Sequence, residues 1–135
     1  MPALRTARAR PRADIAAATL AGMFAVTGAM HFLRPEIFDP IVPPRLPGSS
    51  RSWTYASGAA ELLLAGLVGS RRLRNLGGLL SGILLVAVFP ANVRTIRVVR
   101  RRALPVRLIA LARLPIQVPL VALALRVGRS EEESR

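Results

Sequence analysis

The 135-residue chain carries 20 arginines, no lysine and seven acidic residues, so its formal net charge is +13, yet 52% of its residues are hydrophobic and its mean hydropathy is positive. The absence of cysteine excludes disulfides, thiolate metal sites and iron–sulfur clusters within the chain. The arginines flank apolar runs and have few aromatic residues near them, which argues against a nucleic-acid-binding protein.

Four apolar runs, each long enough to cross a bilayer, organise the sequence. Three of them hold 19 residues and the fourth holds 18, and their only formal charges are Glu61 and Arg113. At ~1.5 Å rise per residue, 19 residues make a helix about 28 Å long, close to the ~30 Å hydrocarbon core of a bilayer. The sequence therefore predicts an all-α integral membrane protein, a four-helix bundle in the lipid bilayer. Its predicted spans are about 15–32, 53–69, 76–93 and 108–127.

A basic tail, residues 1–14, precedes the first span, and we expect it to be disordered and cytoplasmic. Between the first two spans lies a proline-rich loop, residues 33–51, whose five prolines forbid a continuous helix. Short helical turns, for instance over 35–39, are compatible with this loop. Because the loop also carries several large apolar residues, we expect it to lie on the membrane surface or to fold into the mouth of the bundle, with Pro43 and Pro44 as lining residues.

The third and fourth spans carry further signals of packing and distortion. Gly78 and Gly82 form a G-x-x-x-G pattern, which permits close approach of a second helix and is interpreted here as packing. Pro115 and Pro119 should kink the fourth span or loosen its backbone hydrogen bonds. Residues 128–135 form an acidic C-terminal tail.

The distribution of arginines does not decide the orientation in the membrane. The side that holds both termini receives 10 arginines and the opposite side receives nine, so the positive-inside rule gives a draw. Four arginines precede the first span, which usually sets the orientation. On that ground we place both termini in the cytoplasm.

Polar groups at membrane depth are the expected location of any function. Connectivity brings the end of the first span, the start of the second, the end of the third and the start of the fourth to one membrane face. The sequence therefore predicts an intramembrane polar cluster that opens toward the proline-rich loop and is either a ligand site or a structural one. Its members are His31, Glu61, Asn92, Arg113 and Gln117.

Two interpretations of Glu61 and Arg113 stay open. Their axial offset is about 6 Å, which an arginine side chain can cover, so they form either a structural clasp between the second and fourth spans or the lining of a ligand cavity. If Arg113 does not reach Glu61, burial favours the neutral carboxyl and makes Glu61 a candidate proton carrier. A lone His31 is more often an interfacial hydrogen-bonder than a ligand, and Asn92 and Gln117 can each satisfy carbonyls freed by nearby prolines.

The sequence shows no catalytic constellation: it has no Ser/His/Asp order with a nucleophile elbow, no histidine pair at metal spacing and no phosphate-binding loop. We therefore expect no metal site, no cofactor held by the chain itself and no catalytic activity of its own.

Five short blocks carry a family resemblance. They are His31-Phe32 with Pro35 and Phe38, Ile41-Val42-Pro43-Pro44 with Leu46-Pro47, Ser57-Gly58 with Glu61, Val88-Phe89-Pro90-Ala91-Asn92, and Arg113-Leu114-Pro115 with Gln117. In this arrangement, from about His31 to Leu125, the chain resembles the DoxX-like family of small bacterial membrane proteins. The Phe-Pro-Ala-Asn and Ile-Val-Pro-Pro blocks are the specific parts of the resemblance.

The resemblance implies a four-span bundle in the plasma membrane. Some DoxX-like proteins are similar to subunits of quinone-linked thiosulfate oxidation, and others are associated with membrane oxidoreductase complexes or oxidative-stress defence. Our first hypothesis is thus an accessory, non-catalytic subunit of a membrane redox system that contacts a quinone, its partner being a membrane oxidoreductase or a second copy of the chain. The second is a small proton-coupled transporter or channel that uses Glu61. The third is a structural membrane protein with no ligand.

Overall fold

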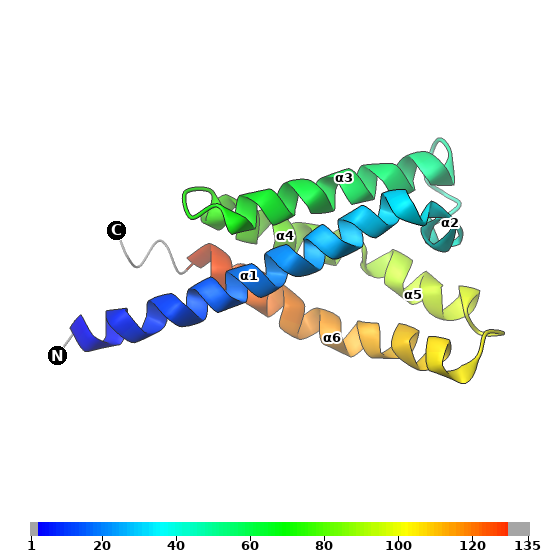
Figure 1. The fold of residues 1–135 in the computed structure, drawn as a ribbon. Coiled ribbons are helices and arrows are strands. Elements are labelled where there is room, and N and C mark those ends of the chain that lie inside the picture. The colour runs from blue at the N-terminus through cyan, green and yellow to red at the C-terminus, as the bar shows by residue number, and fades with distance from the viewer. Residues whose placement is uncertain (1–2, 130–135) are drawn as a thin grey trace.

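The computed structural model describes residues 3–129, with side chains from Arg12 onward. Every regular element in this part of the chain is a helix, which confirms the predicted all-α class. In Figure 1, α1 and α3 lie side by side and antiparallel, α4 and α5 run back toward the end where α3 begins, and α6 returns. The elements are α1 (Ala3–Leu33), α2 (Pro35–Phe38), the 3-10 turn η1 (Asp39–Ile41), α3 (Ser50–Gly69), α4 (Arg74–Ala87), α5 (Phe89–Val98) and α6 (Leu104–Arg129).

Two helical stretches among the described residues, Arg12–Leu33 and Leu104–Arg129, are long and apolar enough to cross a membrane. Helices α4 and α5 together qualify as a third, but they are bent by about 40° at the break after Ala87. The stretch 76–93, for which the sequence predicted the third span, is thus divided between α4 and α5. Pro90 has no N–H to continue the helical hydrogen bonds, so the chain ends one helix and starts another at this point.

Helix α3 has 20 residues and is therefore long enough to cross a membrane, but its composition is too polar for it to count as a candidate membrane-spanning helix. Its first turns carry Arg51 and Thr54, and Glu61 lies near its middle. Of the four predicted spans, length and composition therefore support two, or three when the bent pair is counted.

Helix α1 begins at Ala3, so the backbone of residues 3–14 is helical where the sequence predicted a disordered tail. Alanine and arginine, which dominate this stretch, are strong helix formers and extend the helix beyond the apolar run. Asp14 then connects α1 to the start of α4 and to the turn before it, because it accepts hydrogen bonds from Arg71 at 3.0 Å and from the buried Arg74 at 2.8 Å.

Helix α6 begins at Leu104, four residues before the predicted fourth span. It continues as one helix through Pro115 and Pro119. Most of the predicted tail over 128–135 lies outside the described residues.

A pair of glycines lets α4 approach two helices at once. A methyl group on Gly77 would lie 2.7 Å from the backbone nitrogen of Val68 in α3. A methyl group on Gly78 would lie 2.4 Å from the nitrogen of Gly128 and 2.6 Å from the carbonyl of Ala124, both in α6. The packing role predicted for Gly78 is thereby confirmed. The largest fully buried side chains of the bundle are Leu20, Val68, Val127, Thr54 and Ser81.

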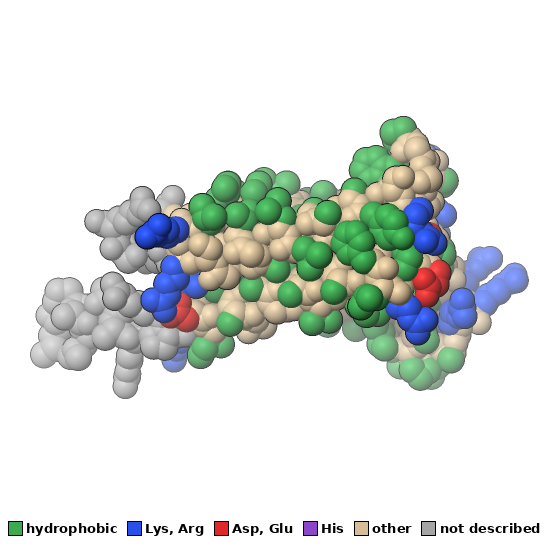
Figure 2. Space-filling view, turned by 45° about the horizontal axis from the view of Figure 1, so that its top comes forward, with side chains coloured by type: hydrophobic (Ala, Val, Ile, Leu, Met, Phe, Trp, Pro, Cys, Tyr) green, Lys and Arg blue, Asp and Glu red, His purple; other side chains and the backbone are tan. Residues whose placement is uncertain are grey.

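The sides of the bundle are apolar and its ends are charged. Figure 2 shows hydrophobic side chains along the helices, with arginine, aspartate and glutamate side chains gathered toward the two ends. Ile15, Val26, Leu63, Ile83 and Val118 are each more than half exposed. An exposed apolar surface of this extent is unusual for a water-soluble monomer and matches the membrane-spanning length of the helices.

Candidate functional site

The proline-rich loop folds over one end of the bundle. Prolines restrict the backbone to short turns, and the loop accordingly forms α2 and η1, as predicted for residues 35–39. Phe38 and Leu46 line a cavity beneath the loop, together with Pro43. The loop therefore folds into the bundle mouth, one of the two predicted placements. Pro44, expected to be a lining residue as well, is exposed and lies outside the cavity wall.

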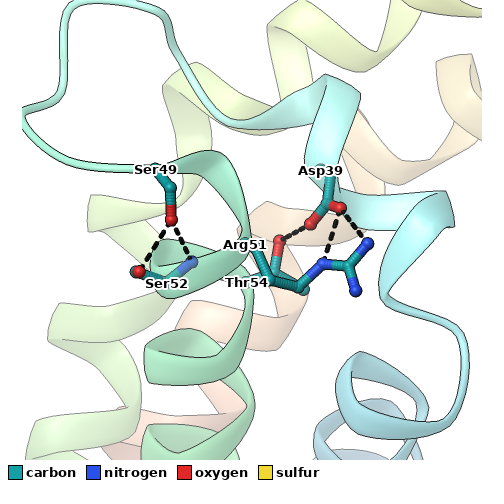
Figure 3. A network of polar contacts seen from close by, with 5 residues as sticks. All are labelled: Asp39, Ser49, Arg51, Ser52 and Thr54. Atoms are coloured by element: carbon teal, nitrogen blue, oxygen red, sulfur yellow. Dashed lines mark hydrogen bonds and ion pairs between the residues drawn. The ribbon is translucent and has the colours of Figure 1, made fainter.

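Asp39 anchors this loop to the start of α3 (Figure 3). Its Oδ2 accepts hydrogen bonds from Arg51 Nε at 2.8 Å and lies 2.7 Å from Arg51 Nη2, and its Oδ1 accepts one from the buried hydroxyl of Thr54 at 2.7 Å. Ser49 caps α3 by accepting a hydrogen bond from the backbone N–H of Ser52. The side chain of Asp39 thus holds the loop to the first turns of α3, and Ser49 caps the N-terminus of that helix.

Two further bonds hold the loop from neighbouring elements. Trp53 Nε1 donates to the carbonyl of Pro47 at 2.6 Å, and Arg94 Nε in α5 donates to the carbonyl of Pro40 at 3.1 Å. Prolines cannot donate, but their carbonyls can accept, so these bonds use the one backbone group that each proline offers. The loop is therefore connected to α3 and to α5.

The Asp39 anchor predicts an acid-sensitive stability. The hydrogen bonds from Arg51 and Thr54 hold the pKa of Asp39 below its ordinary value of 3.8. Because the folded pKa is lower than the unfolded one, the stabilisation is complete above about pH 4 and is lost as the pH falls through the folded value. We expect Asp39→Asn to lower the Tm of the detergent-solubilised protein at pH 7, and this difference from wild type to shrink below about pH 4.

The matched control for this prediction is Glu36→Gln in the same loop. Glu36 is exposed and its ion pair with Arg34 is 3.4 Å long, so its replacement should leave the Tm unchanged at every pH. A Tm difference for Asp39→Asn that stays constant between pH 7 and pH 3 would contradict the role of the ionised carboxylate.

The cavity beneath the loop has a volume of about 460 Å³. Its walls are mainly apolar and come from the loop, α3, α4, α5 and α6, together with the end of α1. Among its polar lining groups are four of the five residues that the sequence predicted to cluster. These four are His31, Glu61, Asn92 and Arg113.

Glu61 is held by α1. The hydroxyl of Thr27 donates a hydrogen bond to Glu61 Oε2, and His31 Nδ1 lies 3.9 Å from the same oxygen. His31 Nδ1 also donates to the carbonyl of Thr27 at 2.8 Å, and its ring stacks on Phe38 with centroids 3.8 Å apart. These contacts require α1 and α3 to lie very close, which Gly58 permits, because a methyl group there would lie 2.6 Å from the Cβ of His31.

The clasp between Glu61 and Arg113, one of the two interpretations left open by the sequence, is not formed. Among the ion pairs of the described residues, none joins these two side chains, although both line the cavity. The reason lies in the lateral order of the helices: α3 packs against α1 and α4, whereas α6 packs mainly against α4. Arg113 and Glu61 therefore line the same cavity from different helices without forming an ion pair.

Gln117, the fifth predicted member, lies behind the cavity wall. It accepts a hydrogen bond from Asn92 Nδ2 at 2.7 Å and donates one to the carbonyl of Leu85. The Leu85 carbonyl belongs to the last turn of α4, whose carbonyls lack partners within the helix. Gln117 thus satisfies a carbonyl exposed by the α4–α5 break, while Asn92 binds Gln117 and not a freed carbonyl.

Among the residues of the site that the sequence analysis did not identify are Thr27, Asp39 and Thr54. Thr27 was identifiable, because it lies four residues before His31 and so one helical turn away on the same face of α1. Asp39 lay in a loop whose fold could not be derived from proline positions. Without it, Thr54 had no recognisable partner.

A family model described as Domain of unknown function (DUF8561) matches residues 20–128, about four-fifths of the chain. The chain belongs to the DUF8561 family. The region matched by the DUF8561 model includes every polar residue of the cavity named above. Comparisons with curated proteins and with solved structures gave no match.

Proposed function

We propose that this DUF8561 protein is a DoxX-like, multi-pass protein of the plasma membrane, a four-span bundle with both termini in the cytoplasm. It serves as an accessory subunit of a membrane redox system and binds a quinone head group in the cavity beneath the proline-rich loop. Its partner is a membrane oxidoreductase or a second copy of the chain. The observation that carries this proposal is the cavity itself, which combines apolar walls with a few converging polar groups at the end of an apolar bundle.

The lining of the cavity fits the chemistry of a quinone head. A quinone ring is flat and apolar with two carbonyl acceptors, and it carries two electrons and two protons when bound in a redox system. Arg113 supplies hydrogen-bond donors, and Asn92 Nδ2 has a second N–H besides the one given to Gln117. Phe38 and Trp53 supply aromatic surface. The volume of about 460 Å³ lies within the ~300–1,000 Å³ usual for ligand sites.

The single tryptophan makes the proposal directly measurable. Trp53 lines the cavity, so all tryptophan fluorescence of the chain reports on this site. Titration with a tail-free dimethoxy-methyl-benzoquinone should quench that fluorescence to a saturating level. Arg113→Gln should raise the dissociation constant about tenfold or more, because it removes a charged donor to a ligand carbonyl.

Arg107→Gln is the matched control, since Arg107 precedes Arg113 by six residues in α6, is exposed and does not line the cavity. It should leave the titration unchanged. Quenching that rises linearly without saturation, or equal curves for Arg113→Gln and wild type, would contradict quinone binding. Purification from mild detergent as an isolated chain with no quinone would count against the accessory role. If Glu61→Ala then lowered only the Tm, the purely structural hypothesis would remain.

A second function, proton-coupled transport, is favoured by the surroundings of Glu61. The hydroxyl of Thr27 lies within hydrogen-bond distance of both Glu61 and the carbonyl of Met23. An ionised Glu61 accepts a hydrogen bond from the Thr27 hydroxyl. A protonated Glu61 can instead donate a hydrogen bond to that hydroxyl, which then donates one to the carbonyl of Met23. The site thus accommodates both protonation states with the same heavy-atom positions. Glu61→Gln should abolish proton-coupled efflux in proteoliposomes, and unchanged efflux would exclude this function.

A further inference from the structure

A second hollow lies on the outside of the bundle, next to the cavity. It has a volume of about 420 Å³ and is located where α4 gives way to α5, facing α6. Its walls are almost entirely apolar and include Val86 and Phe89 on one side and Leu114, Val118 and Val121 on the other. Val86, Phe89 and Val118 are 60%, 45% and 73% exposed, so this groove opens onto the apolar flank of the protein.

The groove and the cavity are neighbours. Pro90 lines both of them. Gln117 lines the groove and is hydrogen-bonded to Asn92, which lines the cavity, so this amide pair lies between the two spaces. The two hollows differ in character, because ionisable side chains line the cavity and none lines the groove.

From this juxtaposition we infer that the ligand is an amphipathic molecule with a long hydrocarbon tail, whose head occupies the cavity and whose tail lies in the groove. The inference rests on the proposed quinone site and adds to it the class of ligand and its route, which is lateral entry from the bilayer past the α4–α5 break. A tail already dissolved in lipid gains little from apolar burial, so the groove orients the tail rather than extracting it from water. The ligand therefore does not need to pass through the loop.

A photoreactive ligand tests this inference on the full chain in lipid nanodiscs. The probe is the benzoquinone used above with a ten-carbon tail that ends in a diazirine, and cross-linked peptides are mapped by mass spectrometry. We expect labelling to concentrate on the residues that line the groove. Val118→Phe, which fills the groove from its exposed wall, should reduce that labelling about tenfold.

Ile116→Phe is the matched control, since Ile116 is exposed on the same helix but does not line the groove. It should leave labelling unchanged. Labelling spread evenly over apolar surface residues such as Ile15 and Ile83, equal labelling of Val118→Phe and wild type, or displacement by phosphatidylglycerol but not by unlabelled quinone would each overturn the inference. In those cases saturable quenching of Trp53 by the tail-free quinone would still support the proposed function, whereas its absence would show that the proposed function itself fails.

Discussion

Gly78→Ala is expected to destabilise the bundle by at least about 2 kcal/mol and to lower its Tm by roughly 5–10 °C. The added methyl group would lie 2.4 Å from the nitrogen of Gly128 and 2.6 Å from the carbonyl of Ala124. Both are backbone atoms inside α6, so no side chain can rotate away and the two helices must separate. The substitution also gains up to about 1 kcal/mol of helix propensity, which is included in this estimate.

Gly22→Ala provides the matched control for this prediction. Gly22 lies inside α1, and a methyl group there would meet no atom within 4 Å. The same chemical change should therefore be neutral or stabilise the protein by up to about 1 kcal/mol. Thermal unfolding of both variants in one detergent separates packing from propensity. Equal Tm values for the two variants would contradict the close contact between α4 and α6.

The all-helical class and four polar residues of the cavity were predictable, because both follow from how charges are distributed along the chain. Charge-free runs mark the helices, and the alternation of direction brings His31, Glu61, Asn92 and Arg113 to one end of the bundle. Axial position is fixed by the rise per residue, so residues at similar depth can be identified from the sequence. These four of the five predicted members line the cavity, whereas Gln117 does not.

Lateral order was not predictable, and for that reason the sequence left the partner of Glu61 open. Axial position alone allowed Arg113 to contact Glu61. Because α3 packs against α1 and α4, however, the hydroxyl of Thr27 in α1 is the group that binds the Glu61 carboxylate. The lateral neighbours are selected by contacts such as that of Gly58 with His31, and a glycine in an apolar run does not indicate which helix it will face. Similarly, the sequence indicated that prolines free backbone carbonyls near Asn92 and Gln117, but the size of the resulting bend depends on what binds those carbonyls.

That dependence leads to an expected result for Gln117→Leu, a loss of about 2 kcal/mol in the free energy of unfolding. Gln117 is buried and connects three helices: it belongs to α6, donates to the Leu85 carbonyl of α4 and accepts from Asn92 of α5. Leucine has a similar size but leaves the carbonyl and the Asn92 amide without these partners in an apolar region. Thermal unfolding in detergent, with Ile116→Leu as the neighbouring exposed control, measures this loss.

A double-mutant cycle with Asn92→Leu shows whether the two amides act as a unit. Once Gln117 is replaced, Asn92 has lost its acceptor, so its own replacement should cost about 1 kcal/mol less than it does in wild type. Additive losses would contradict the bond between the two side chains. Since this bond lies between the cavity and the groove, the coupling also predicts that Gln117→Leu alters the saturating quench of Trp53. The Ile116→Leu control, which changes neither wall, should leave that quench as it is in wild type.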